Sequence, residues 1–215
     1  MASGHRTGTA HKTGAGQRTV GEATKARIVA AALECLRTNG IVGTSARAIA
    51  RTGDFNQALI FYHFGSVTEL LIAAGSSESE RRAQRYAERL AEVSTLPELV
   101  TVARELHEEE LAGGSVAVLT QMLAATAHSD ELRQALLDGF QPWLRLVEGA
   151  VERVLAGTAY AGAVPITDVS FAIASLFLGI ELMSGLDPAR AAERRLFTTI
   201  ETFAGVADLL LQVRR

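Results

Sequence analysis

Apolar side chains recur every three to four residues along most of the chain, which is the spacing of amphipathic α-helices. The pattern breaks at Gly40, at Gly53 and Asp54, at Gly113 and Gly114, and between Gly157 and Pro165. Runs of β-branched residues, which are typical of strands, are absent. The sequence therefore predicts an all-α protein of about nine helices.

Two short helices joined by a tight turn are predicted between residues 44 and 66, which read TSARAIARTGDFNQALIFYHFGS. Thr44 or Ser45 can cap the first of them, and Asn56 can cap the second. The turn falls at Gly53 and Asp54, where the glycine can take a positive φ and the aspartate can bond its own backbone. This arrangement predicts a helix-turn-helix.

The second short helix leaves an outer surface formed by Gln57, Ala58, Phe61, Tyr62 and His63. An amide can bond adenine, a methyl group can contact thymine, and tyrosine and histidine can donate to phosphates. Such a surface suits the major groove of duplex DNA. Periodicity alone is equally compatible with any small helical hairpin.

Residues 24–71 resemble the DNA-binding domain of the tetracycline-repressor (TetR) family. The resemblance is carried by TKARIVAAALECLRTNG, GTSARAIA, NQALIFYHF and GSVTELL, and above all by the triplet Tyr62, His63 and Phe64. It implies a dimeric one-component transcription regulator, most often a repressor, whose larger domain holds a small-molecule effector. It also implies phosphate contacts from Thr44, Arg47 and Tyr62. The full expected DNA-binding set is Thr44, Ser45, Arg47, Asn56, Gln57, Ala58, Phe61, Tyr62 and His63.

Two residues depart from the family pattern. Asp54 stands where the family usually has a glycine in the turn, and Val67 stands where it usually has a lysine that reaches a phosphate. Without that lysine, the slope of log affinity against log salt becomes shallower by about 0.9 for each phosphate that is no longer neutralised. These departures leave open an alternative, in which a TetR-type fold acts mainly through a protein partner and binds no operator strongly.

Charge is divided unevenly along the chain. Residues 1–65 hold eight Lys or Arg against three acids, whereas residues 66–215 hold thirteen against twenty-one. A basic end on an acidic body fits a protein that meets a polyanion through one surface. Residues 1–22 are rich in Gly, Thr, Ala and Ser, so we expect a disordered basic arm that either follows the DNA or is a solvated tail.

Length and composition predict a small helical domain over residues 23–68 and a larger one over residues 69–215. The most apolar segment, residues 169–180, is too short to span a bilayer and indicates a buried helix. We find no apolar signal-peptide core at the amino end, and the single cysteine, Cys35, has no partner for an internal disulfide. A cytoplasmic protein without a membrane span is expected.

The last two predicted helices, over residues 167–184 and 189–213, carry apolar residues at helical spacing on more than one side. Such helices need both an inner and an outer partner, so we expect a homodimer that reads a palindromic operator. The expected interface comprises Ile173, Phe177, Ile180, Leu196, Ile200, Phe203, Ala207 and Leu210.

An effector pocket is expected among the fourth to seventh helices, next to the interior Pro142. Its expected residues are His107, Glu110, Leu119, Gln121, Met122, Phe140 and Trp143. The run from His107 to Glu110 is also typical of a solvated helix face.

Catalytic signatures are absent: the chain contains no HExxH, GxSxG or GxxxxGK motif and no Cys/His spacing that suits a metal. We therefore expect neither an enzyme nor a cofactor or metal site. The expected partners are a DNA operator, a small effector and a second copy of the chain.

Overall fold

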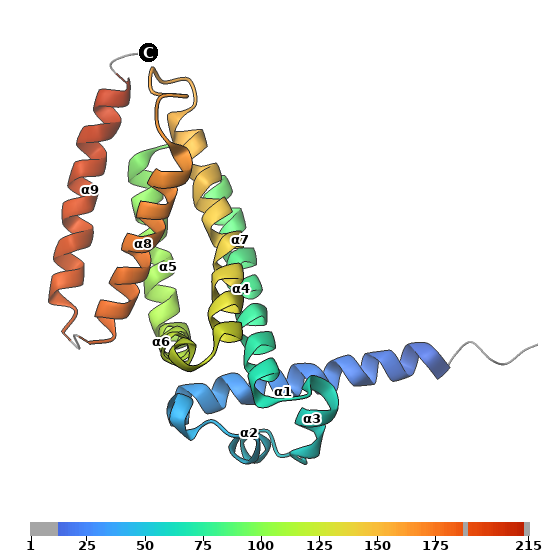
Figure 1. Ribbon diagram of the computed structural model, residues 1–215. Coiled ribbons are helices and arrows are strands. Elements are labelled where there is room, and N and C mark those ends of the chain that lie inside the picture. The colour runs from blue at the N-terminus through green and yellow to red at the C-terminus, as the bar shows by residue number, and fades with distance from the viewer. Residues whose placement is uncertain (1–12, 187–188, 213–215) are drawn as a thin grey trace, which may run out of the picture. The chain divides into compact units, whose positions relative to one another are not determined.

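A computed structural model describes residues 13–186 and 189–212, which form nine α-helices and one short 3-10 turn and contain no strand (Figure 1). The all-α prediction is confirmed. The helices are α1 (Thr13–Gly43), α2 (Ala46–Thr52), α3 (Ala58–Phe64), α4 (Val67–Ala91), α5 (Leu96–Gly113), α6 (Ser115–Ala125), α7 (Asp130–Leu155), α8 (Ile166–Ser184) and α9 (Ala191–Gln212), with the 3-10 turn at Thr126–His128. Two compact units meet within α4, between Leu71 and Ile72.

The N-terminal unit is built around fully buried aliphatic side chains from three helices. Ile28 and Leu36 come from α1, Ile49 from α2 and Ile60 from α3. Cys35 is buried among them and behaves as a small apolar residue. Because α2 and α3 have only seven residues each, their stability depends on this packing more than on helix propensity.

The first helix begins earlier than the sequence suggested. α1 starts at Thr13, within the segment 1–22 for which we expected a disordered arm, and the first twelve residues lie outside the described part of the chain. Thr24 donates to the carbonyl of Val20, a bond typical of continuous helix. Near its other end the helix is interrupted at Gly40, whose φ of 65° and ψ of 178° are not helical.

The turn between α2 and α3 uses its two residues in the opposite way to our expectation. Gly53 has an ordinary φ of −95°, and Asp54 has the positive φ of 50°. Aspartate tolerates this left-handed conformation better than most residues, so Asp54 occupies a position that suits a glycine. Gly53 is needed for space, since a Cβ there would lie 2.7 Å from Cδ1 of Phe55 and 2.8 Å from Cβ of Ala31.

The C-terminal unit has clear helix caps at its loops. Thr95 and Glu98 form a reciprocal capping box at the start of α5, and the Ser129 hydroxyl accepts the Leu132 amide at the start of α7. Gly114, with a φ of 70°, separates α5 from α6. These stops agree with the breaks in the sequence pattern.

Helices α5 and α9 pack on each other, as do α7 and α8 (Figure 1). Their main core contains Tyr86, Leu90, Leu106, Val154 and Phe177. In the described part of the chain, α8 is the one individual helix long and apolar enough to cross a membrane. Helices at the core of globular proteins pass the same test, and Phe177 of α8 lies in this core.

Candidate functional site

The exposed side of α3 is the first candidate site. Tyr62 is 82% exposed and Phe61 is 51% exposed, although both are large aromatic residues. Gln57 and Ala58 are also exposed, and His63, which is half-buried, meets the Tyr62 ring edge-on with centroids 4.9 Å apart. Solvent-facing aromatic side chains beside an amide and a methyl group form a surface that lacks a partner within the described unit.

Local hydrogen bonds fix the residues that begin α2 and α3. Oγ of Ser45 accepts the Ala48 amide at 3.2 Å, so Ser45 is the cap of α2. The Thr44 hydroxyl instead donates to the carbonyl of Gly40 at 2.7 Å. Oδ1 of Asn56 accepts the Ala58 amide at 2.8 Å, which leaves the side-chain amide hydrogens as the groups that Asn56 can offer.

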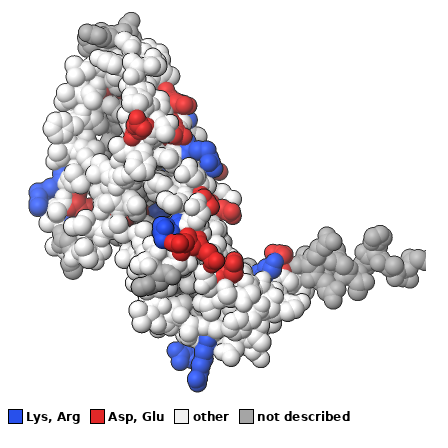
Figure 2. Space-filling view, viewed as in Figure 1, with Lys and Arg blue, Asp and Glu red and all other residues white. Residues whose placement is uncertain are grey.

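Basic side chains lie close to this surface in sequence and on the same unit. Arg47 and Arg51 of α2 are both exposed. Figure 2 shows basic side chains projecting from the foot of the unit, in the region where Figure 1 places α2. Arg27 lies over the Phe55 ring at 5.6 Å, a cation–π distance. Positive charge on the same unit as the exposed side of α3 favours the binding of a polyanion.

A second candidate site is a cavity of about 300 Å³ inside the C-terminal unit. Its walls come from α4, α6, α7 and α8. Four of the residues expected at an effector site line it, namely Leu119, Met122, Phe140 and Trp143. Ring contacts order one wall, with Phe140 and Trp143 centroids 5.2 Å apart and Trp143 and Phe177 centroids 5.4 Å apart.

The other expected effector residues, His107, Glu110 and Gln121, do not line the cavity. His107 and Glu110 are fully buried instead, so the interpretation of this run as a solvated helix face is wrong for these two residues. The physical reason is that ionic partners from other helices meet them, and helical spacing cannot reveal such partners. Helix α5 contributes no cavity wall, whereas α8 does.

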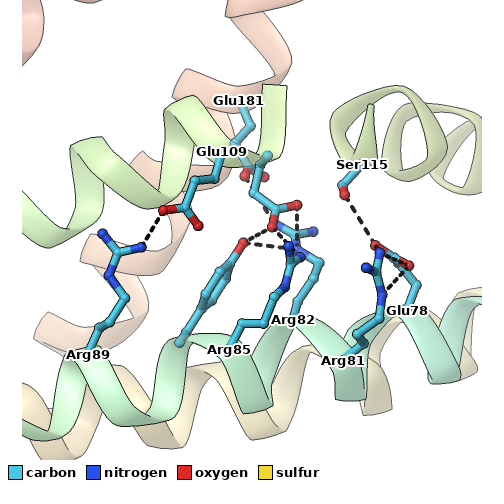
Figure 3. Close-up of polar contacts among 10 residues, drawn as sticks. Glu78, Arg81, Arg82, Arg85, Arg89, Glu109, Ser115 and Glu181 are labelled. Carbon is cyan, nitrogen blue, oxygen red and sulfur yellow. Dashed lines mark hydrogen bonds and ion pairs between the residues drawn. The ribbon is translucent and has the colours of Figure 1, made fainter. Parts of the chain in front are cut away.

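Glu110 belongs to a buried ionic cluster between α4, α5 and α8, of which Figure 3 labels Arg82, Arg85 and Glu181. Nε of Arg82 lies 3.0 Å from Oε2 of Glu110, and its Nη2 lies 3.0 Å from Oε1 of Glu181. Arg85 also pairs with Glu110 at 2.9 Å, and the Tyr86 hydroxyl donates to the same carboxylate. The cluster ties three helices together next to the cavity.

Arg82 and Glu181 both line the cavity, and sequence reasoning did not identify either of them. Burial raises the pKa of Glu181 to about 7; Arg82 opposes this shift and Glu110 adds to it. Burial alone would lower the pKa of Arg82, but Glu181 and Glu110 raise it. One signal was available in the sequence: Glu181 is the one acid beyond the first turn of a mostly apolar helix, and a buried acid requires a cation or hydrogen-bond donors.

His107 belongs to a second polar cluster, which joins α5, α8 and α9. Nε2 of His107 lies 3.2 Å from Glu193 and 3.3 Å from the Ser184 hydroxyl, and Ser184 and Arg190 also bind Glu193. Burial lowers the pKa of His107. Although burial alone would raise the pKa of Glu193, bonds from Arg190, Ser184 and His107 hold it at about 2. This cluster fastens the α8–α9 turn to α5.

An apolar surface on α8 and α9 is the third candidate site. It contains Leu176 and Met183 of α8 and Leu196, Phe203, Val206 and Leu210 of α9, all of them exposed. Leu196, Phe203 and Leu210 repeat every seven residues, and Val206 falls between the last two, as in a helix-packing seam.

Several residues of the expected interface face the interior of the unit instead. Phe177 and Ile180 are buried, and Ile173 packs against both core clusters. Phe177 and Ile180 therefore have almost no surface to offer a second copy, whereas the place of the half-buried Ile173 in an interface stays a prediction. Since α8 is apolar on more than one side, its sequence does not distinguish the inner from the outer side. Ile200 and Ala207 are half-buried along α9.

Comparison with known families identifies the N-terminal unit. Residues 28–74 match the family described as bacterial regulatory proteins, tetR family. The match includes α2, α3 and the beginning of α4, and therefore contains the exposed surface of α3. None of the curated proteins matches the chain.

Solved structures show the same fold over most of the chain. A protein from Mesorhizobium loti assigned to the TetR-family transcriptional regulators has a TM-score of 0.71 at 17% identity, with 86% of this chain and 97% of that chain covered. The transcriptional regulator FadR from Bacillus subtilis, in complex with stearoyl-CoA, has a TM-score of 0.67 at 17% identity and covers 83% and 96%. Escherichia coli NemR in its reduced form has a TM-score of 0.69 at 13% identity and covers 83% and 96%. At these identities the likeness establishes the fold.

Proposed function

We propose that this chain, whose N-terminal domain belongs to the tetR family of bacterial regulatory proteins, is a one-component transcription regulator that reads duplex DNA with α3. The observation that carries the proposal is the exposure of Tyr62 and Phe61 on a short helix whose other side, at Ile60, is fully buried. Packing at Ile60 holds the helix in place, so that these side chains point into solvent. Gln57 and Ala58 then contact bases, and Tyr62, Thr44 and Arg47 contact phosphates.

The regulator acts as a homodimer in this proposal. The exposed seam of Phe203, Val206 and Leu210 on α9, with Leu176 and Met183 on α8, is the surface that a second copy covers. An interface between identical helices is two-fold symmetric, so the two copies of α3 read inverted half-sites about one helical turn apart, roughly 34–36 Å.

The cavity in the C-terminal unit is the effector site of the proposed regulator. Its size falls at the lower end of the range typical of small-molecule pockets, roughly 300–1,000 Å³, and its walls are mainly apolar. FadR of Bacillus subtilis, which has the same fold, was solved with a small molecule, stearoyl-CoA. An effector bound here contacts α4, which continues into the N-terminal unit, and so lowers operator affinity and relieves repression.

The proposed role places the protein in the cytoplasm with the chromosome and requires neither catalysis nor a membrane. The alternative role, in which the TetR-type fold acts through a protein partner, is favoured by one feature: Val67, at the start of α4, offers no charge to a phosphate. The DNA-binding experiment below distinguishes the two roles.

The proposal is tested by gel retardation of the duplex that lies upstream of the chain's own gene, at about physiological salt. We expect retardation by the wild-type chain and a loss of roughly tenfold or more in affinity for Tyr62→Ala and for Gln57→Ala. Tyr160→Ala, which removes an exposed tyrosine from the other unit, is the matched control and should bind normally. Absence of retardation by the wild-type chain would favour the partner role.

A further inference from the structure

Acidic side chains outnumber basic side chains in the wall of the cavity. Glu78 and Arg82 of α4 and Glu181 of α8 line the cavity, so two carboxylates and one guanidinium face it. Glu78 and Glu181 are both more than nine-tenths buried. A buried carboxylate is stable only with positive charge or hydrogen-bond donors around it, so the location of each partner matters.

The cation that serves Glu181 is shared. Arg82 divides its guanidinium between Glu181 and Glu110, and Glu110 lies outside the cavity wall. Glu78 accepts from Arg81, whose side chain is 55% exposed and does not line the cavity, and from the Ser115 hydroxyl (Figure 3). Among the charged groups that line the cavity itself, carboxylates therefore outnumber guanidinium groups.

Glu181 is the cavity carboxyl whose pKa is raised. Its neighbours are Arg82 from α4 and Glu110 from α5, and burial brings its pKa to about 7. At neutral pH the carboxyl is therefore partly neutral. A second cation next to it would favour the carboxylate, whereas an anion would meet two carboxylates and a guanidinium that is already engaged.

The rest of the cavity wall is rich in aromatic side chains. The aromatic residues that line the cavity are Phe140, Trp143, Phe171 and Phe177. The ring centroids of Phe140 and Trp143 lie 5.2 Å apart, and the two rings are tilted against each other. Aromatic faces attract ammonium groups and bind apolar groups, and both effects are strongest where water is excluded.

From this arrangement we infer that the cavity binds an organic cation, an amine or quaternary ammonium group on an apolar body, with its charge toward Glu181 and Glu78 and its body against Phe140 and Trp143. The inference rests on the proposed role of the cavity as the effector site. It specifies the class of effector.

Binding is measured with benzyltrimethylammonium, whose charge does not titrate, and with phenylacetate as the anion of similar size. Trp143 is the chain's single tryptophan and lines the cavity, so its fluorescence reports occupancy of this site directly. The full-length protein is titrated at pH 6 and at pH 8. We expect the cation to bind about tenfold or more tightly than the anion, and roughly fivefold to tenfold more tightly at the higher pH.

Glu181→Gln should lower the affinity for the cation about tenfold and remove its dependence on pH. Glu109→Gln is the matched control, because it removes the same charge from a residue that does not line the cavity. Glu109 pairs with Arg89, which does not line the cavity either. An anion that binds as tightly as the cation, or a cation that leaves Trp143 fluorescence unchanged, would overturn the inference.

Operator affinity measured in the same titrations separates this inference from the proposed function. A cation that occupies the cavity without changing DNA binding would support the ligand class and contradict the effector role. Release of DNA by phenylacetate and not by the cation would support the effector role and contradict the ligand class.

Discussion

Arg82 and Glu181 lie 99 positions apart in the sequence, yet Nη2 of the arginine is 3.0 Å from Oε1 of the glutamate. The pair joins α4 to α8 at the wall of the cavity. Since α4 is also the helix that runs from one unit into the other, the pair connects the proposed effector site to the element that the proposed switch moves.

Glu181→Gln should change how stability depends on pH. The folded carboxyl keeps its proton up to a pKa of about 7, whereas the unfolded one loses it near its ordinary value of 4.5. Glu181 therefore stabilises the fold at low pH, and this contribution is lost as pH rises from about 4.5 to about 7. The variant has no such carboxyl. The difference in unfolding free energy, variant minus wild type, should therefore increase by up to about 3 kcal/mol from pH 5 to pH 8.

Urea unfolding of both proteins at the two pH values checks this prediction. His107 titrates in the same region with the opposite sign, because its lowered pKa makes the fold lose stability as pH falls. That contribution is common to both proteins and cancels in the difference. An equal difference at pH 5 and pH 8 would contradict the account of Glu181.

Gly53→Ala should destabilise the N-terminal unit by about 1–3 kcal/mol. The new methyl group would collide with the Phe55 ring and with Cβ of Ala31, and a residue in the turn has little room to shift. Thermal unfolding followed by circular dichroism measures the effect. Gly21→Ala is the control, since no atom lies within 4 Å of its Cβ position, and it should leave stability unchanged or raise it by up to about 1 kcal/mol.

Phe203→Asp should convert the proposed dimer into a monomer and remove operator affinity with it. Phe203 is 70% exposed in the single chain, so the monomer should remain folded, as circular dichroism will show. A charge in the centre of an apolar interface is strongly unfavourable. The control is Tyr160→Asp, which places the same charge at an exposed position of the C-terminal unit between α7 and α8. A dimer of Phe203→Asp in sedimentation would reject this interface.

Val67→Lys should strengthen DNA binding and make it more sensitive to salt. The substitution restores a charge at the start of α4, where the family pattern has a lysine, and each phosphate contact adds about 0.9 to the slope of log affinity against log salt. Leu186→Lys adds the same charge at an exposed position of the other unit. Equal slopes for the two variants would mean that Val67 lies too far from the phosphates.

The elements of the fold could be predicted because short-range signals determine them. Ser66 caps α4, Ser129 caps α7 and Gly114 ends α5, and each is recognisable from residue type and position. Which side of a helix faces inward was less predictable. α8 is apolar nearly all round, so Phe177 and Ile180 could not be assigned to the core from spacing alone.

The ionic clusters were not predictable for a different reason. Arg82, Glu110 and Glu181 come from three different helices, and no local pattern indicates that they meet. The aromatic wall at Phe140 and Trp143 was found, because bulky apolar residues beside an interior proline indicate a buried position. The turn between α2 and α3 is an intermediate case. Gly53 and Asp54 were correctly recognised as turn residues, but the positive φ belongs to Asp54 and not to Gly53.

Selection of bound sequences from a random duplex pool tests most directly whether two copies of α3 read the major groove of one duplex. We predict an enriched inverted repeat whose half-sites are centred about one helical turn apart, and loss of that enrichment with Gln57→Ala. A pool that stays random, or an enriched site without two-fold symmetry, would contradict it.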